Sequence, residues 1–230
     1  MRTTLFTASA LALAIAAPSV HAHQAGDIIV RAGAVTVQTH ESTSSVKGDR
    51  GALTSAPYGN LGGKATINND TQLGLNFAYM ITDQWAVELL AATPFKHDVK
   101  IKGTTPNVDG KLGSFKHLPP TLSAVYYPLK NSSAFKPYVG AGVNFTWFFD
   151  ESVSSEAKAG GFTNLNINDS WGLAAQVGAD YMLTDNIMLN GQIRYIDIDT
   201  TAYASHAAGR AKVNVDVKPW VYMLGLGYKF

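Results

Sequence analysis

Histidines, carboxylates and serines are the side chains of this sequence that could support catalysis, because its 230 residues include no cysteine. The lack of thiols excludes a disulfide framework and any thiolate-based zinc or redox site. A Ser/His/Asp arrangement needs a histidine that a carboxylate holds within reach of a serine. Beyond residue 22, the histidines fall at the start of the chain, in long connections or at expected strand ends near the surface: His23, His40, His97, His117 and His206. We find no arrangement of residues that would form an enzyme active site, and we expect no cofactor.

Two smaller groupings could bind an ion or move a proton. His97-Asp98 and His117 could approach each other at one end of adjacent strands, as a metal or acid/base site requires. Asp197 and Asp199 share one face of an expected strand and could hold a divalent cation. Histidines at the surface, near the ends of strands, are more common than such a site. Neighbouring carboxylates there more often pair with a nearby Lys or Arg, or with a lipopolysaccharide-bound cation. We therefore assign no metal site.

Composition and charge exclude further classes of function. Only 15% of the residues are charged, which argues against a disordered, acidic or basic tail. The formal net charge is +1, so we expect no nucleic-acid partner. The 21 glycines and the many Asn, Thr and aromatic residues suit strands and turns.

The first 22 residues have the pattern of a secretory signal peptide. Arg2 is followed by an apolar stretch over residues 5–17, then by Pro18 and by Val20-His21-Ala22 around a cleavage point. A buried N-terminal helix is the alternative, but the flanking residues fit it less well. We expect the folded domain to span residues 23–230. No later stretch approaches the ~20 consecutive apolar residues of a membrane helix, so the exported chain would enter a membrane only as strands.

Alternation of large apolar with small or polar residues recurs along the chain, and a period of two indicates strands. It is clear over residues 72–79, 139–147, 171–181 and 222–230. We predict eight strands, near residues 27–38, 70–81, 85–96, 115–128, 136–149, 169–182, 187–200 and 212–230. Short connections alternate strictly with long ones, so the long loops (39–69, 97–114, 150–168 and 201–211) should all lie at one end.

The strand face opposite the large apolar residues distinguishes a membrane barrel from a soluble sandwich. This face consists mostly of Gly, Ala, Asn, Gln and Thr, which line the lumen of an outer-membrane barrel whose apolar face meets lipid. Aromatic residues also form two belts. One lies near the short turns (Tyr79, Trp85, Tyr126, Tyr181 and Tyr228) and the other near the long loops (Phe95, Trp147, Trp171 and Trp220). We predict an all-β fold, an eight-stranded antiparallel transmembrane β-barrel of the outer membrane.

The end of the chain is typical of the signature that outer-membrane barrels present to the barrel assembly machinery. Apolar residues alternate up to a terminal phenylalanine, in the series Tyr222, Leu224, Leu226, Tyr228 and Phe230. We expect this machinery, outer-membrane lipids and lipopolysaccharide to be partners.

The lumen of an eight-stranded barrel is filled by side chains or holds one small ligand. Alternation assigns a polar lower lumen to Arg31, Asn76, Glu88, Gln176, Asp180, Asn190 and Gln192, which could interlock as a plug. It assigns an apolar upper lumen to Val35, Val37, Leu90, Phe148, Ile196, Ile198, Val221 and Met223. Arg194 interrupts this upper layer, and we count it with the polar plug. Leu90 is the expected constriction, since it follows Glu88 on the same face. The upper residues would form either a cup for a small hydrophobic solute, which could leave sideways through the wall, or a plain packed core.

Several stretches resemble the outer membrane protein W (OmpW) family of small Gram-negative barrels. They cover essentially the whole chain after residue 22 and include residues 71–75, 87–95, 117–121, 137–142, 169–172, 197–202 and 219–220. The resemblance implies an eight-stranded barrel with a narrow hydrophobic lumen, associated with passage of small apolar molecules into or across the outer membrane. It favours the solute cup over the packed core.

A second, non-enzymatic function remains open. The long loops could act as an adhesin or as a phage or toxin receptor, since loops often carry such functions. The polar residues 42–45 and 152–155 contain no readable recognition motif.

Overall fold

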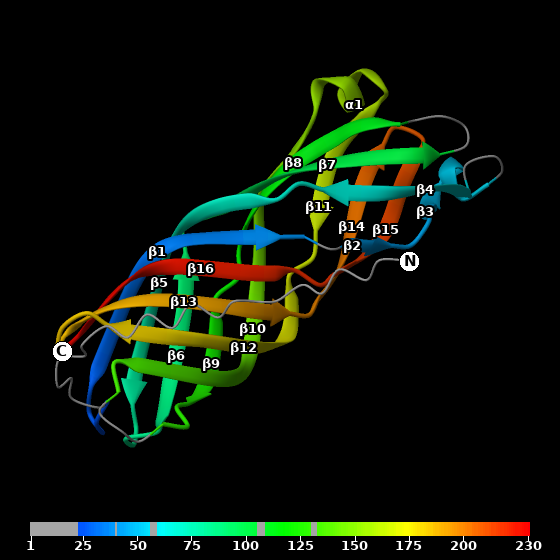
Figure 1. Ribbon diagram of the computed structural model, residues 1–230. Helices are drawn as coiled ribbons and strands as arrows, with labels where there is room; N and C mark the ends of the chain where they lie inside the picture. Colours follow the sequence, from blue (N-terminus) through cyan, green and yellow to red (C-terminus); the bar gives the residue numbers. More distant parts are fainter. Residues whose placement is uncertain (1–22, 40, 56–58, 105–108, 130–132) are drawn as a thin grey trace, which may run out of the picture.

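The structure is a computed structural model that describes residues 23–39, 41–55, 59–104, 109–129 and 133–230 (Figure 1). The expected signal peptide, residues 1–22, and His40 lie outside these residues, so the division of the chain after residue 22 stays a prediction. Among the described residues, no helix is long and apolar enough to cross a membrane.

Eight antiparallel strands close into a barrel, as the alternation predicted. Each strand pairs with the next along the chain, and the last pairs with the first, which leaves no open sheet edge. We call this the barrel tier. It consists of β1 (Ile28–Gln38), β5 (Asp70–Met80), β6 (Trp85–Ala92), β9 (Thr121–Tyr126), the first part of β10 (Phe135–Val153), β12 (Ser170–Met182), β13 (Ile187–Ile196) and β16 (Trp220–Lys229).

The large apolar residues of the barrel tier point outward, which confirms the assignment of the two faces. Leu73, Leu173 and Leu224 are 58%, 71% and 64% exposed. Such exposure of large apolar side chains is expected where they face lipid. Aromatic residues mark both ends of this surface, for example Trp85 at 50% exposure and Trp171 at 73%. The residues of the expected assembly signature, from Tyr222 to Phe230 at alternate positions, also face outward.

The expected long loops are mostly folded, which corrects the sequence prediction. Beyond the membrane the chain continues as a second layer of strands, which we call the outer tier (Figure 1). It consists of β2 (Glu41–Thr43), β3 (Val46–Gly51), η1 (Ala52–Thr54), β4 (Asn60–Ile67), β7 (Phe95–Thr104), β8 (Gly110–Leu118), the end of β10 from residue 147, α1 (Ser155–Ala159), β11 (Phe162–Ile167), β14 (Ile198–His206) and β15 (Gly209–Val217).

Proline residues divide the two tiers in three places. Pro94 separates β6 from β7, Pro119-Pro120 separates β8 from β9, and Pro219 separates β15 from β16. Proline has no N–H to donate to a ladder, so regular pairing ends there. The Asn144 side-chain amide donates to the carbonyls of Pro119 and Pro120, at 3.0 and 3.1 Å. The predicted strands 85–96, 115–128 and 212–230 are therefore each two strands.

At one of these breaks, the residues that point inward change from even-numbered to odd-numbered positions. In β6 the even residues point inward, whereas in β7 the odd residues are buried, starting with Phe95 at 1% exposure. Phe95 is therefore an interior side chain, and its prediction as part of the outer aromatic belt is wrong. The break at Pro94 lets the chain present its apolar side to the interior once lipid no longer surrounds it.

Candidate functional site

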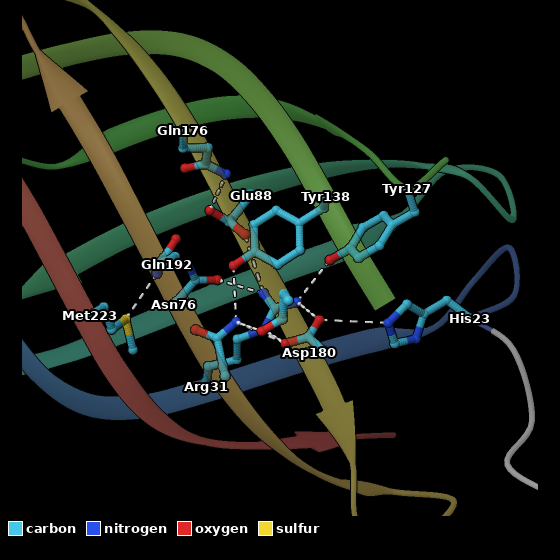
Figure 2. Close-up of polar contacts among 12 residues, drawn as sticks. His23, Arg31, Asn76, Glu88, Tyr127, Tyr138, Gln176, Asp180, Gln192 and Met223 are labelled. Carbon is cyan, nitrogen blue, oxygen red and sulfur yellow. Dashed lines mark hydrogen bonds and ion pairs between the residues drawn. The ribbon is translucent and has the colours of Figure 1, made fainter. Parts of the chain in front are cut away.

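The polar residues inside the barrel tier interlock, and Arg31 lies at their centre (Figure 2). Its guanidinium binds Asp180 in a two-pronged pair, with Nε–Oδ1 at 2.9 Å and Nη2–Oδ2 at 2.6 Å. It also donates to Asn76 and Glu88 through Nη1, at 3.1 and 3.2 Å, and to the Tyr127 hydroxyl at 2.8 Å. Such two-pronged arginine pairs are strong and fix geometry.

Glu88 joins a second arginine to this network. Its Oε1 accepts hydrogen bonds from Arg194 and Gln176, both at 2.8 Å, and Arg194 Nε donates to Gln176 at 2.7 Å. Asn190 donates to Asp180 and to the Tyr138 hydroxyl, at 2.8 and 2.9 Å. We call this set the plug: Arg31, Asn76, Glu88, Gln176, Asp180, Asn190 and Arg194. Its two arginines and two carboxylates balance, and each of these four charged residues is at most 1% exposed.

An apolar layer that the sequence analysis missed lies on the periplasmic side of the plug. It includes Ile29, Met80, Met182 and Met188, all at most 1% exposed. The alternation contained the signal, since Ile29 and Arg31 share a face. His23 lies at this end, 3% exposed, with its ring 5.0 Å from that of Tyr127 and its Nε2 3.7 Å from Asp180 (Figure 2).

Above the plug the interior becomes apolar. Five of the eight residues expected in the upper lumen pack into this layer with exposures of 5% or less: Val35, Leu90, Ile196, Val221 and Met223. We call them the floor. Gln192, expected in the polar lower lumen, donates to the Met223 sulfur at 3.0 Å, whereas Arg194 bonds to Gln176 and Glu88 in the plug.

The other three expected lumen residues, Val37, Phe148 and Ile198, line a cavity above the floor. This narrow cavity has a volume of about 50 Å³. A wider cavity of about 300 Å³ adjoins it, and the two share Ile101, Leu112, Ala202 and Val213. The wider cavity reaches Glu156 and Gly160 beside α1, at the far end of the outer tier. We call the two cavities together the cup.

His97 and His117 meet in the wall of the narrow cavity, as their sequence positions allowed. Their Nε2 atoms are 3.1 Å apart, and both residues are buried, at 1% and 6% exposure, which corrects the expectation of surface histidines. Phe95 and Phe148 pack against His117, with ring centroids 5.4 and 5.8 Å away. Burial, with His97 beside it, lowers the pKa of His117 to about 3, and burial also lowers the pKa of His97. Both rings are neutral at pH 7.

Asp197 and Asp199 lie at the rim together with a third carboxylate, that of Asp216. One oxygen of each lies within 4.8 Å of the others. Burial and the neighbouring Asp216 raise the pKa of Asp199. Lys218 pairs with Asp216 at 3.0 Å. The expected pairing of Asp197 and Asp199 with a rim cation stays a prediction.

Closed antiparallel strands, a lipid-facing apolar surface and a polar core below an apolar cup define an outer-membrane β-barrel. The sequence profile of the OmpW family matches residues 24–230, and the chain belongs to this family of outer-membrane barrels. Outer membrane protein W of Vibrio cholerae is 43% identical over 230 residues, which cover 100% of both chains. The names of relatives such as that of Vibrio cholerae describe outer-membrane proteins and not enzymes.

Solved structures show the same architecture. The crystal structure of OprG from Pseudomonas aeruginosa has 48% sequence identity and a TM-score of 0.84, and the match covers 92% of this chain and 99% of that one. The solid-state NMR structure of outer membrane protein AlkL in lipid bilayers has 26% identity and a TM-score of 0.62, with coverage of 93% and 94%. The location in the outer membrane follows from this family membership and fold.

Proposed function

We propose that the protein takes up small hydrophobic molecules passively from outside the cell through the cup. The observation that carries this proposal is the apolar cavity pair in the outer tier, directly above a floor of apolar side chains. A solute that buries about 100 Å² of apolar surface there would gain roughly 2.5 kcal/mol. Concave, mostly apolar cavities of this kind are the usual form of small-molecule sites.

The plug argues against straight passage to the periplasm. Four balanced charges and their amide and hydroxyl partners fill the barrel tier, and each hydrogen bond would have to be broken for a solute to pass. A buried ion pair that loses one partner costs about 3–5 kcal/mol. The solute therefore needs another exit, and Leu90 in the floor marks the lower limit of its path.

A seam in the wall of the cup provides this exit. In the order of paired strands, β11 and β10 are the two edges of the outer tier. Among the described residues, no ladder joins residues 147–153 of β10 to residues 162–167 of β11. Phe148 and Ile167, one on each side of the seam, both line the narrow cavity. Two hydrogen bonds cross here, from Phe148 N to Asp169 at 3.0 Å and from Ile167 N to Glu151 at 3.4 Å.

The position of the seam suits release into the membrane. Trp147 and Trp171, which are 50% and 73% exposed, lie at its base, where aromatic side chains mark the membrane interface. A solute that leaves between β10 and β11 would enter the outer leaflet without crossing the plug. One relative supports the class of solute: a Pseudomonas aeruginosa protein, 28% identical over 74% of this chain, bears the name dibenzothiophene metabolism operon protein PahQ. Dibenzothiophene is a small apolar aromatic molecule.

Reversible cross-linking of the seam tests this function. The natural chain has no cysteine, so Glu151→Cys and Ile167→Cys would create one thiol pair across the seam, to be joined by a thiol cross-linker that a reductant cleaves. Uptake of tritiated naphthalene would be followed in vesicles with a lipopolysaccharide outer leaflet. We expect the cross-link to reduce uptake to that of vesicles without protein, and the reductant to restore it.

A pair across a regular ladder serves as the matched control. Ser114 and Ser152 are partners in the β8–β10 ladder, with their hydroxyls 3.0 Å apart, so Ser114→Cys with Ser152→Cys accepts the same cross-linker. This cross-link should leave uptake unchanged. Uptake that is equal with and without the seam cross-link would rule out lateral exit, and uptake no faster than through bare vesicles would rule out the function itself.

A further inference from the structure

Three neighbouring strands of the outer tier, β4, β7 and β8, lie side by side and carry six lysines (Figure 1). We propose that their outward surface, which we call the lysine face, binds the phosphate groups of lipopolysaccharide in the outer leaflet. This interaction surface is separate from the cup and goes beyond solute uptake. The lysine face consists of Lys64, Lys96, Lys100, Lys102, Lys111 and Lys116.

The register of the strands places the lysines of this face opposite one another. Each has another lysine as its direct partner across a ladder: Lys64 with Lys102, Lys96 with Lys116, and Lys100 with Lys111. Like charges directly opposite each other destabilise a sheet. An anion that binds between the strands removes this repulsion.

Only two of the six lysines are paired with carboxylates among the described residues. Lys111 lies 2.7 Å from Asp98, and Lys116 lies 2.9 Å from Asp150. The other four are exposed and form no ion pair with any described residue: Lys64, Lys96, Lys100 and Lys102. These four can therefore bind an external anion without breaking an ion pair of the fold.

Two further carboxylates next to the lysine face are held by backbone N–H groups. Asp70 accepts a hydrogen bond from the N–H of Lys96 at 2.8 Å. Asp109 accepts hydrogen bonds from the N–H groups of Gly103 and Thr104, at 2.7 and 2.9 Å. In the described part of the chain, no ion pair joins either carboxylate to the lysine face.

Cations also oppose each other between β3 and β15, but there a carboxylate lies among them. The ladder partners are Arg210 with Arg50 and Lys212 with Lys47. Asp49 pairs with Arg210 and lies 3.9 Å from both Arg50 and Lys212. The outer tier thus supplies its own counter-charge between β3 and β15 and leaves the lysine face to an external anion.

The position of the lysine face selects the anion. Lys116 lies two residues beyond Leu118, whose ladder partner is Trp147 at the membrane interface. Lys96, the partner of Lys116, is therefore near the lipid headgroups, and Lys100 lies about 14 Å further along its strand. Lipopolysaccharide carries phosphates on lipid A at the membrane surface and on the inner-core sugars above it. Its phosphates therefore span the same range of heights as the lysines.

A matched pair of lipids tests the proposal. One is lipopolysaccharide truncated after its inner core, and the other is the same lipid after dephosphorylation. Their affinities for the protein in neutral detergent micelles would be measured by native mass spectrometry. A lysine near an anionic lipid contributes about five-fold in affinity. We expect Lys96→Gln with Lys100→Gln to weaken binding of the phosphorylated lipid by about 25-fold and to leave binding of the dephosphorylated lipid unchanged.

A second pair of lysines serves as the matched control. Lys212 and Lys218 have side chains 42% and 47% exposed, and each lies within 4 Å of a carboxylate, that of Asp49 at 3.9 Å and that of Asp216 at 3.0 Å. Lys212→Gln with Lys218→Gln removes the same charge from another side of the outer tier. Because salt screens distant charges, this variant should change the affinity for the phosphorylated lipid by less than about two-fold.

Unfolding in guanidinium without lipopolysaccharide separates anion binding from a role in the fold. Lys96→Gln with Lys100→Gln relieves repulsion between opposed lysines, so its midpoint should equal or exceed that of the wild type. Added lipopolysaccharide should raise the midpoint of the wild type more than that of this variant. A midpoint below that of the wild type in the absence of lipid would overturn the proposal, because the lysines would then stabilise the fold itself.

The binding measurements can also overturn the proposal. Equal affinities of the wild type for the two lipids would exclude phosphate recognition. An equal loss in the two double variants would reduce the effect to overall charge. Lysine-dependent binding of dextran sulfate, with no preference between the two lipids, would assign the face to a soluble polyanion instead. Each of these results leaves solute uptake through the cup unaffected, so the two proposals fail separately.

Discussion

The barrel tier and the outer tier are consecutive parts of the same strands, yet they bury opposite kinds of side chain. In the barrel tier, Arg31 and Glu88 are buried while Leu73 is exposed. In the outer tier, Val99 and Ile101 are buried while the lysines between and beside them, at positions 96, 100 and 102, are exposed. The surrounding medium explains the inversion, since lipid receives the apolar face of a strand and water the polar one. The burial pattern therefore shows where each strand leaves the membrane.

The two interiors consequently serve different purposes. Buried, paired charges hold the barrel tier closed, and the stability that they contribute depends on every partner being present. The apolar interior of the outer tier has no such interlocking, and it contains the cavities. Stability should accordingly depend on the plug and solute binding on the cup.

Removal of one plug carboxylate should have the largest effect. Glu88→Ala leaves Arg31 and Arg194 with one buried carboxylate between them, and we expect a loss of about 3–5 kcal/mol in the free energy of unfolding. Guanidinium unfolding of the barrel in detergent micelles measures it. A loss below about 1 kcal/mol would mean that water reaches the plug and that the barrel tier is not sealed.

Acidification should have an intermediate effect, confined to the outer tier. The pKa values of His97 and His117 are lowered in the folded state, to about 3 for His117, whereas an unfolded histidine titrates near 6.5. The unfolded chain binds these protons first, so stability is full above about pH 6.5 and decreases as pH falls below it. We expect His117 to contribute about 1.4 kcal/mol per pH unit to this decrease, and His97 to add to it in the same direction.

Unfolding of wild type and His117→Phe between pH 7.5 and 4.5 measures this slope. The variant should lose the contribution of one histidine and keep that of His97. Identical slopes in the two proteins would contradict the burial of a neutral His117 in the cup wall.

Loss of an exposed ion pair in the outer tier should have the smallest effect. Asp150 and Lys116 are 2.9 Å apart with side chains 61% and 42% exposed. Lys116→Ala should change the free energy of unfolding by less than about 1 kcal/mol, because water screens such pairs. The same unfolding assay as for Glu88→Ala gives a direct comparison of a surface pair with the plug. An equal loss for both variants would remove the distinction between the two tiers.

Much of the barrel tier could be predicted from the sequence, because lipid imposes a strict alternation on every strand. The plug residues followed from the same rule, since a polar residue on an inward face of a lipid-surrounded strand must find a polar partner. Arg31 and Asp180, 149 positions apart, illustrate this: their faces were predictable, but their two-pronged pairing depends on the register between strands.

The outer tier was much less predictable, because the strand pattern is interrupted at the prolines and changes phase between β6 and β7. Extending the phase of β6 past Pro94 placed Phe95 outside, and it also hid His97 as a cavity residue. The prolines at 94, 119, 120 and 219 were the available signal, since proline inside a strand pattern indicates a break. The meeting of His97 and His117 was predictable only as a contact at the end of adjacent strands. Their burial came from the packing of rings above the membrane, which the alternation does not determine.

The central claim is that a small apolar solute occupies the cup above a plug that stays closed. An NMR titration of the protein in nanodiscs with 4-propylphenol tests it most directly, with the methyls of Val37 and Ile198 reporting on the cup and the side-chain Nε of Arg31 and Arg194 on the plug. We predict saturable shifts of the cup resonances and unchanged plug resonances. Shifts of the plug resonances, or none in the cup, would contradict the account.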